Sequence, residues 1–457
     1  MSASQLRSRQ NRLGRGDLGL KAMQHSHIHG ADESTALLDH PRPFQSMARD
    51  HLSQHQHGLR SWPRQVGQTF WAVVSNSWIN VLLVFVPFGI AAGVVDWPPI
   101  AIFVLNFLAI IPLAAMLSFA TEELSAVAGP QIGGLLNATF GNAIELIVSI
   151  IALMKGEYRL IQASLLGSVL VNILLVLGCC FIAGGIRRRE STFDSTVARI
   201  MTALMMLAAG ALVVPAILYA TLLNSKDGDT VEIIQVSRGT AVILAVVYVF
   251  YLVFQLRTHS GLFTDDQEEG KHGEPEPGEE VNPDVARAEN AEEDGRTLGL
   301  WSALTTLILT TVCVGFCAEF LVDAINPIVD STPMSKTFIG IILLPIVTNA
   351  AEHVTAVIVS WKGKMNLALL VDLGSGLQIA LFVTPLLVIL AWIMGKDLTL
   401  HFQLFETVVF FLSVLVVNVL IRGGTSNYLE GLMLVGWYLI IAVAFFYYKE
   451  PDNLYGF

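Results

Sequence analysis

Long apolar runs constrain this chain more than any other feature of its sequence. Of its 457 residues, 53% are hydrophobic and 14% are charged, whereas a soluble globular protein has about 25% charged residues. Many runs reach the roughly 20 residues with which a helix crosses a bilayer. Inside hydrocarbon only helices and closed barrels satisfy the backbone, and these runs are continuous rather than alternating. The sequence therefore predicts an all-α polytopic membrane protein.

The apolar runs predict about eleven transmembrane spans. The first two are separated at Asp96-Trp97-Pro98-Pro99, because proline ends a helix and tryptophan suits the membrane interface. The predicted spans are residues 73–95, 98–124, 133–154, 160–185, 196–222, 236–255, 299–325, 336–360, 367–393, 400–421 and 427–448.

One segment of the chain occurs twice. Ile132–Leu170 can be laid without a gap on Ile339–Leu377. The matched pairs include Gly133/Gly340, Asn142/Asn349, Ala143/Ala350, Glu145/Glu352, Gly167/Gly374 and Ser168/Ser375. The copies fall in the third and eighth spans, an odd separation, so they cross the membrane in opposite directions. Such inverted repeats are typical of alternating-access transporters.

The repeat predicts the domain organisation. We expect two inverted five-helix halves and one extra N-terminal transmembrane helix. The predicted parts are a cytosolic disordered or regulatory tail (1–70), the extra helix (71–97), the first half (98–255), an acidic cytosolic linker (256–298), the second half (299–448) and a short C-terminal tail (449–457).

Basic residues orient the spans. Arginines and lysines gather in alternate loops, which the positive-inside rule places on the cytosolic side. These residues are Arg60 and Arg64, Arg187 to Arg189, Arg257, Lys362 and Lys364, and Arg422. The N-terminus and the linker are then cytosolic.

A carboxylate lies near the centre of each duplicated span. Glu145 and Glu352 are therefore expected close to the bilayer midplane, where a carboxylate is costly and usually functional. Asn142 and Asn349 lie three residues earlier, so each amide shares a helix face with its carboxylate. Gly141 and Pro345 loosen the two helices and free backbone carbonyls.

The span that follows each copy adds small neutral polar groups. They are Gln162, Ser164, Gly167, Ser168 and Asn172 in the first half, and Gly374, Ser375 and Gln378 in the second. Two carboxylates with amide, hydroxyl and backbone oxygens form a site for a hard cation, and calcium takes six to eight oxygens. Cys179, Cys180, Cys313 and Cys317 all lie in apolar spans, where packing is the simpler interpretation than thiolate metal binding.

The two carboxylates predict how such a site works. When empty they repel each other and are desolvated, so the site is expected to take up protons, and an arriving divalent cation displaces them. Alternatively, each Glu remains neutral or pairs with a neighbour such as Arg199. His353 is either a hydrogen-bonding residue of the helix face or a proton relay or selectivity element.

At these residues the chain resembles the calcium/proton exchangers of the calcium/cation antiporter superfamily, most closely the fungal vacuolar type. The resemblance covers roughly 70–448 and rests on GGLLNATFGNAIELI (133–147), QASLLGS (162–168), NAAEHVTA (349–356) and QIALF (378–382). It implies ten core helices, an extra N-terminal helix and proton-driven loading of the vacuole with calcium. It also implies that Glu145 and Glu352 bind cation and protons, helped by Asn142, Asn349, Gln162, Ser168, Ser375 and Gln378.

The chain departs from this family at three positions. Thr348 stands where glycine is usual, Asp372 where a small apolar residue is usual, and Gly376 where serine is usual. Asp372 adds a third mid-membrane carboxylate and, like His353, is a possible further site residue. Ion preference and coupling are the properties that these departures put in question.

Acidic residues outside the duplicated spans suggest how ions reach the site. Residues 265–294 hold thirteen acidic and two basic residues, which accounts for the formal charge of −11. This linker is either a solvated tether or an acidic segment that gathers or senses calcium. Glu122, Glu123 and Glu319, predicted near the ends of the first helix of each half, could line the access paths.

We therefore predict a secondary calcium/proton antiporter of the vacuolar membrane, with calcium, protons and the lipid bilayer as partners. An exchanger for manganese or sodium, or a transport-inactive calcium sensor with the same fold, are the alternatives. No nucleotide loop of the GxxxxGK[ST] type is present, so we expect no enzymatic activity. No cofactor and no nucleic acid partner are expected, and a homo-oligomer is possible.

Overall fold

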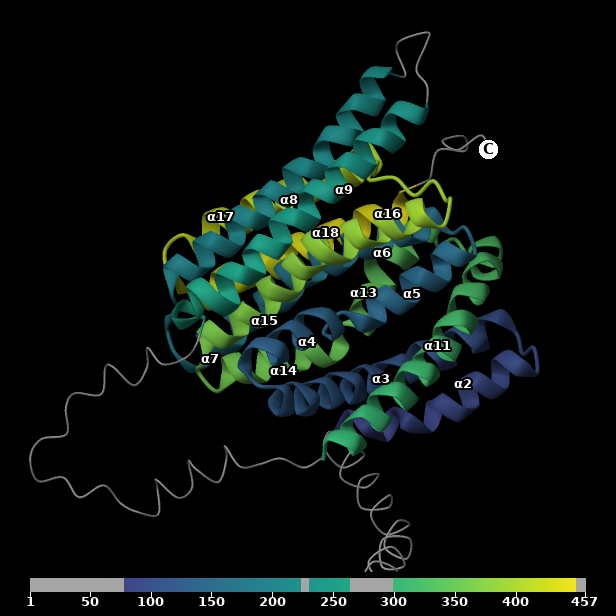
Figure 1. The fold of residues 1–457 in the computed structure, drawn as a ribbon, viewed down its shortest axis with the longest axis horizontal. Coiled ribbons are helices and arrows are strands. Elements are labelled where there is room, and N and C mark those ends of the chain that lie inside the picture. The colour runs from purple at the N-terminus through teal and green to yellow at the C-terminus, as the bar shows by residue number, and fades with distance from the viewer. Residues whose placement is uncertain (1–77, 223–229, 264–298, 449–457) are drawn as a thin grey trace, which may run out of the picture. The chain divides into compact units, whose positions relative to one another are not determined.

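The computed structural model describes residues 78–222, 230–263 and 299–448, which are almost entirely helical. The predicted tail 1–70, most of the predicted linker 256–298 and the C-terminal segment 449–457 lie outside the described residues. Figure 1 shows the helices as a layered bundle, with α2, α3 and α11 on one side and α8, α9 and α17 on the other.

The extra helix and the first half supply the first set of elements. The π-helical and 3-10 segments carry η labels. In chain order they are η1 Trp78–Val84, α2 Phe85–Val94, α3 Pro99–Ala128, α4 Pro130–Phe140, α5 Ala143–Met154, α6 Tyr158–Leu170, η2 Val171–Val176, α7 Leu177–Arg187, β1 Ser191–Thr192, α8 Ser195–Leu222, α9 Thr230–Val253, η3 Phe254–Thr258 and η4 Ser260–Leu262.

The second half repeats this order. Its elements are α11 Leu300–Ser331, α12 Lys336–Phe338, η7 Ile339–Leu343, α13 Leu344–Thr348, α14 Ala350–Trp361, α15 Met365–Gln378, η8 Ile379–Val383, α16 Thr384–Ile393, α17 Leu404–Ile421, β2 Thr425–Ser426 and α18 Tyr428–Tyr447.

Equivalent helices of the two halves pack reciprocally. The first helices, α3 and α11, form the most extensive pair, and the fourth helices, α8 and α17, form another. The fifth helix of each half packs on the third helix of the other, α18 on α7 and α9 on α16. This exchange is what a two-fold relation between inverted repeats requires.

The duplicated spans are broken rather than continuous. The first breaks between α4 and α5, and in the second the helices on either side of Asn349 meet at a bend of 59°. Within the described residues, eight helices are long and apolar enough to cross a membrane, or nine if this bent pair is one span. The N-terminal helix, Ile79–Val94, and α5 are shorter. Helices occur at all eleven predicted positions, while the number that fully cross is not fixed by length alone.

The first span packs outside the two halves, against α3 and α11. A side chain at Gly93 would lie 2.3 Å from the ring of Phe320, so only glycine lets α2 approach α11 this closely. This contact places the extra helix beside the first helices of both halves.

The predicted cytosolic loops lie together at one end of the bundle, here called the near end. Arg187 donates to the carbonyl of Trp361 over 3.0 Å, and the guanidinium of Arg188 lies against Gly363. Strands β1 and β2 pair there antiparallel, Ser191 with Ser426. The basic loops that the sequence assigns to one side of the membrane are therefore neighbours in space.

The opposite end, called the far end, carries most of the described ion pairs. Lys155 lies 2.5 Å from Asp323, and Lys336 lies 2.6 Å from Glu157. Each of these pairs joins the start of α6 or the turn before it to a helix of the second half. Salt bridges therefore bind the two halves at the far end.

Candidate functional site

The breaks in the duplicated spans position both carboxylates. Asn142 and Asn349 are the N-cap residues of α5 and α14, with φ values of −105° and −99°. Glu145 and Glu352 are the third residues of these helices. The N-terminus of a helix carries a partial positive charge, so each break places a carboxylate where a negative charge is favoured inside the bundle.

Asn142 reaches across to the second half. Its amide nitrogen donates to Gln378 Oε1 over 2.7 Å, and its carbonyl oxygen accepts from the Ser375 hydroxyl over 3.2 Å. Asn172 in turn donates to the Ser375 oxygen over 3.1 Å. Asn142, Ser375 and Asn172 are all buried, so this polar network lies inside the protein.

Asn349 makes the corresponding contact in the other direction. Its amide nitrogen lies 3.3 Å from the Ser168 hydroxyl oxygen and 3.2 Å from that of Thr348. The duplicated asparagines thus each bond the duplicated serine of the opposite half. These reciprocal bonds bring the two breaks together at the centre of the bundle.

The two carboxylates lie within this network and interact with each other. The Thr348 hydroxyl is within reach of Glu145, the Ser375 hydroxyl is within reach of Glu352, and Glu145 and Glu352 repel each other electrostatically. Glu145 is only 3% exposed, which shields it from bulk water. Glu145 Oε1, Glu352 Oε2 and Asn349 Oδ1 are buried and accept no hydrogen bond from the described residues. The centre of the bundle therefore holds buried oxygen atoms without a hydrogen-bond partner among the described residues.

Seven of the eight predicted site residues take part in these hydrogen bonds or in the electrostatic interaction of the two carboxylates. They are Glu145, Glu352, Asn142, Asn349, Ser168, Ser375 and Gln378. The eighth, Gln162, lies two turns from Ser168 on α6, and its amide donates to the carbonyls of Thr399 and His401 over 3.0 and 3.1 Å. Its place in a cation site stays a prediction, since the structure assigns its amide to the far end.

The two possible further residues lie beside the network rather than within it. Asp372 is buried and accepts a hydrogen bond from the Cys180 thiol over 3.3 Å, and it interacts electrostatically with Glu352. His353 is half-buried, and its Nε2 finds no hydrogen-bond partner in the described part of the chain. Arg199 bonds the Ser195 carbonyl, so this contact gives no support to the alternative that it pairs with Glu145.

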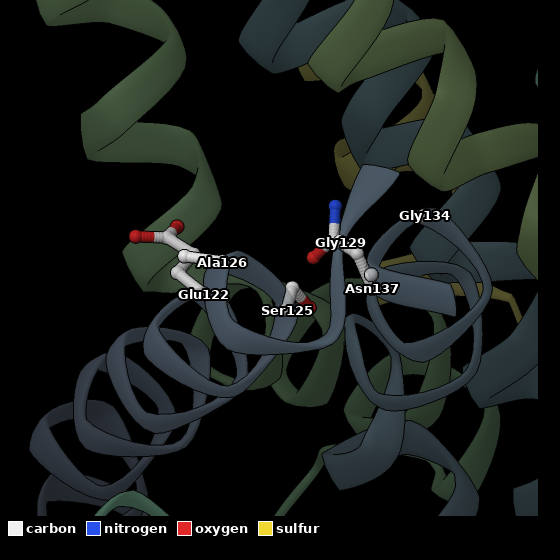
Figure 2. Close-up of a pocket in the computed structure, with 7 residues that line it drawn as sticks. Glu122, Ser125, Ala126, Gly129, Gly134 and Asn137 are labelled. Carbon is white, nitrogen blue, oxygen red and sulfur yellow. The ribbon is translucent and has the colours of Figure 1, made fainter. Parts of the chain in front are cut away.

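An open pocket lies at the near end, beside the start of the first duplicated span. Its cavity volume is about 390 Å³, and it is lined by the end of α3, the turn at Gly129 and the start of α4. Figure 2 shows Glu122 and Ser125 on α3 and Asn137 on α4 around this turn. The predicted access residue Glu122 therefore lines this pocket, and its role in ion access stays a prediction.

The position of Glu319 within its helix differs from the predicted position. The sequence places it near the end of the first helix of the second half, whereas α11 continues to Ser331. Its carboxylate lies 4.0 Å from Lys155 at the far end. The predicted span ended at residue 325, before Asn326 and Pro327, whereas α11 continues through both residues.

The sequence did not reveal a buried charged cluster at the far end. Arg159 Nη2 lies 2.5 Å from Glu406 Oε1, and the Glu406 side chain is fully buried. Arg159 also donates to Gln162 and Thr337 over 3.1 and 3.2 Å. Burial and the positive charge of Arg159 lower the pKa of His401, in the segment before α17, to about 4. The only sequence signal for this cluster is that apolar residues surround both Arg159 and Glu406.

The available ligand chemistry is that of oxygen. Among residues 78–222, 230–263 and 299–448, no three His, Cys, Asp or Glu side chains are grouped closely enough to hold a metal ion by themselves. All four cysteines are free thiols. Carboxylate, amide and hydroxyl oxygens from both halves suit a hard cation such as calcium rather than zinc or copper.

The inverted repeats, the paired broken helices and the buried acidic centre define a polytopic membrane protein of the alternating-access transporter class. Residues 98–257 and 302–447 match the sodium/calcium exchanger protein family. The chain belongs to this family, whose members are exchangers rather than enzymes.

Several relatives are similar over most of their length. The chain is 47% identical over 379 residues to a vacuolar calcium ion transporter of Schizosaccharomyces pombe, covering 83% of this chain and 87% of the relative. It is 40% identical over 383 residues to vacuolar cation/proton exchanger 3 of Oryza sativa subsp. japonica, covering 83% and 88%. The solved structure of YfkE, a calcium/proton antiporter, superposes with a TM-score of 0.65 at 33% identity, covering 80% and 99%.

Proposed function

We propose that this protein is a secondary transporter that exchanges cytosolic calcium for vacuolar protons through one site shared by its two halves. The observation that carries the proposal is the reciprocal pair of contacts, Asn142 with Ser375 and Asn349 with Ser168. These contacts bring Glu145 and Glu352 to the same central region. The names of the relatives, a vacuolar calcium ion transporter and a calcium/proton antiporter among them, support calcium and protons as the exchanged ions.

Calcium binding follows from the oxygen chemistry of this region. Calcium accepts six to eight oxygen ligands in irregular geometry. Glu145 and Glu352 supply the negative charge, and Asn142, Asn349, Ser168, Ser375 and Gln378 supply neutral oxygens or orient the carboxylates. Gln162 belongs to the proposal only if its amide leaves the far-end carbonyls. Asp372 and His353 are candidates for modifying the charge beside the site.

Proton coupling follows from electrostatics. Two carboxylates in a desolvated centre cannot both remain charged and unpaired at low cost. Either calcium or protons can compensate them, and both compete for the same oxygens. A compensated centre can move between the two faces, whereas an empty dianionic centre resists this movement. Exchange is therefore the net result.

The orientation completes the proposal. The near end, with its basic loops and the pocket at Glu122, faces the cytosol, as do the N-terminus and the acidic linker. The halves 98–255 and 299–448 provide the two faces of alternating access. Vacuolar names among the relatives support a location in the vacuolar membrane, and microscopy of a fluorescent fusion beside a vacuolar membrane dye tests this location.

The decisive experiment measures calcium uptake into sealed vesicles with an acidic interior. Glu145→Gln and Glu352→Gln are each expected to abolish proton-driven uptake, because one remaining carboxylate cannot compensate a divalent cation. Both variants must elute as folded protein in size-exclusion chromatography. Uptake by either variant at more than a small fraction of the wild-type rate would refute the shared site.

The same vesicles separate the alternatives. A calcium sensor would bind calcium without flux. An exchanger for manganese or sodium would show competition by that ion at concentrations below those at which calcium saturates uptake. A possible homo-oligomer remains a prediction, which light scattering of the purified protein in detergent tests.

A further inference from the structure

A buried ion pair ties the two halves together at the far end. Arg159 is the second residue of α6 and its side chain is 13% exposed, while Glu406 at the start of α17 is fully buried. Both guanidinium nitrogens take part, Nη2 at 2.5 Å from Oε1 and Nη1 at 3.3 Å from Oε2. Such a bidentate pair fixes geometry as well as charge.

The pair also organises the residues around it. Glu406 Oε2 accepts the backbone N–H of Gln403, and Arg159 donates to Thr337 at the start of the broken span. Arg159 further donates to the oxygen of Gln162, whose nitrogen binds the segment before α17. One arginine thus connects the first half to three separate parts of the second.

The inverted repeat provides an internal comparison. Arg159 corresponds to Asn366, which is likewise the second residue of its helix, α15. Asn366 also faces the start of the fourth helix, α8, where its side-chain oxygen accepts the backbone N–H of Asp194 over 2.7 Å. The same contact is therefore ionic and buried at the far end and neutral at the near end.

The two ends also differ in how open they are to water. The near end has the open pocket with Glu122, whereas at the far end the side chains of Arg159 and Glu406 are only 13% and 0% exposed. An interface that closes with a buried ion pair can open when water hydrates both charges, since hydration replaces their mutual attraction. The pair is thus suited to reversible closure.

We propose that Arg159 and Glu406 are positioning residues for exchange, which hold the far end closed while calcium enters from the near end. Their separation accompanies opening of the far end. Gln162 and Ser168 lie further along the same helix, so movement of Arg159 is transmitted to the central region by α6. This proposal rests on the proposed exchange function.

The ratio of two Michaelis constants tests the proposal. Apparent affinity falls in proportion to the fraction of protein open to the side that is measured. In vesicles with the near end outward, calcium uptake reports the near-side KM and calcium efflux from loaded vesicles reports the far-side KM. The double variant Arg159→Gln/Glu406→Gln removes both charges without leaving one buried alone. It is expected to raise the ratio of near-side to far-side KM by about fivefold or more.

A matched control lies at the same end. Glu157 and Lys336 also join the start of α6 to α12, but both side chains are partly exposed, at 20% and 23%. The double variant Glu157→Gln/Lys336→Gln is expected to leave the KM ratio within about twofold of the wild type. If the Arg159/Glu406 variant is not recovered folded, Arg159→Lys serves in its place, because an ammonium cannot bridge Glu406, Gln162 and Thr337 together.

The outcomes are distinct. A changed ratio in the Arg159/Glu406 or Arg159→Lys variant with an unchanged control supports the proposal. An unchanged ratio, even with slower transport in both directions, shows that the pair only stabilises the fold and overturns the proposal. Absence of exchange in the wild type would instead contradict the proposed function itself.

Discussion

At the scale of single residues, the Thr348 hydroxyl lies in the polar network around the two carboxylates. It accepts from Asn349 and lies within reach of Glu145. A hydrogen bond donated by this hydroxyl stabilises the charged carboxylate, which is the form that binds calcium in the proposed mechanism. A hydrogen bond to a charged group contributes about 1.5–3 kcal/mol.

Thr348→Val keeps the branched shape and removes this hydroxyl. We expect it to raise the near-side KM for calcium about tenfold, with little change in the maximal rate. Thr355→Val is the control, because Thr355 is exposed and bonds only the Ala351 carbonyl of its own helix. Equal effects of the two substitutions on KM would show that the Thr348 hydroxyl does not act on Glu145.

The residues that could be predicted from the sequence are those that the repeat contains twice. Glu145, Asn142 and Ser168 have counterparts at the same spacing, so their convergence follows from two inverted copies. Arg159 and Glu406 have no such signal, because Asn366 replaces the arginine in the other copy. The hydrogen bonds of Gln162 were equally hidden, since they depend on the path of the irregular segment at 394–403.

At the scale of helices, duplicated glycines have unequal roles. A side chain at Gly167 would lie 2.2 Å from the carbonyl oxygen of Ile341, so α6 and η7 of opposite halves approach through this glycine. At its counterpart Gly374 the nearest neighbour is the Met201 methyl group at 3.7 Å, which is ordinary contact. The repeat predicts both glycines as special, whereas packing requires only the first.

Gly167→Ala is therefore expected to lower the free energy of unfolding by about 1–3 kcal/mol, because the backbone of η7 must shift. Gly374→Ala should leave it nearly unchanged or increase it slightly, since alanine favours the helix. Thermal unfolding in detergent, followed by tryptophan fluorescence, measures both. Equal destabilisation by the two substitutions would contradict the close approach of α6 and η7.

The contact between the start of α6 and α12 depends on pH. Burial alone would raise the pKa of Glu157, but hydrogen bonds from Lys336 and Asn326 and the charge of Lys336 outweigh it, so the pKa lies below its ordinary value of 4.5. Because the folded pKa is depressed, the contact contributes its full stability above pH 4.5. That stability is lost as the pH falls through the lower folded value.

Glu157→Gln is expected to cost about 1 kcal/mol or less at pH 7, a small value because both partners are partly exposed. The difference from the wild type should shrink below pH 4.5. Glu190→Gln, at an exposed position of the near end, is the control and should show no such change. A difference that grows on acidification would mean that Lys336 does not stabilise the charged form of Glu157.

At the scale of the whole molecule, the packing of equivalent helices on each other makes the protein a pair of similar bodies. The predicted fold class, all-α with inverted halves, agrees with this packing and with the family match. What the sequence could not supply is the difference between the ends. The copies are alike in their central residues, and the ends are formed by turns that the repeat does not preserve.

This arrangement predicts which forms of the protein can change sides. In the proposed mechanism, calcium-loaded protein is electrically compensated at Glu145 and Glu352 and can face either end, whereas the empty dianionic form cannot. Vesicles loaded with radioactive calcium should therefore release it rapidly into an alkaline medium that contains unlabelled calcium. They should release it at most about one tenth as fast into an alkaline medium without calcium, where neither ion allows the return step.

Rapid release into both media would indicate a channel or uniporter, because the empty protein would then return unloaded. Release into neither medium would indicate a calcium-binding protein without transport. Glu352→Gln, which lacks one carboxylate, should show only background release in both media, and this background sets the scale on which the wild-type difference is judged.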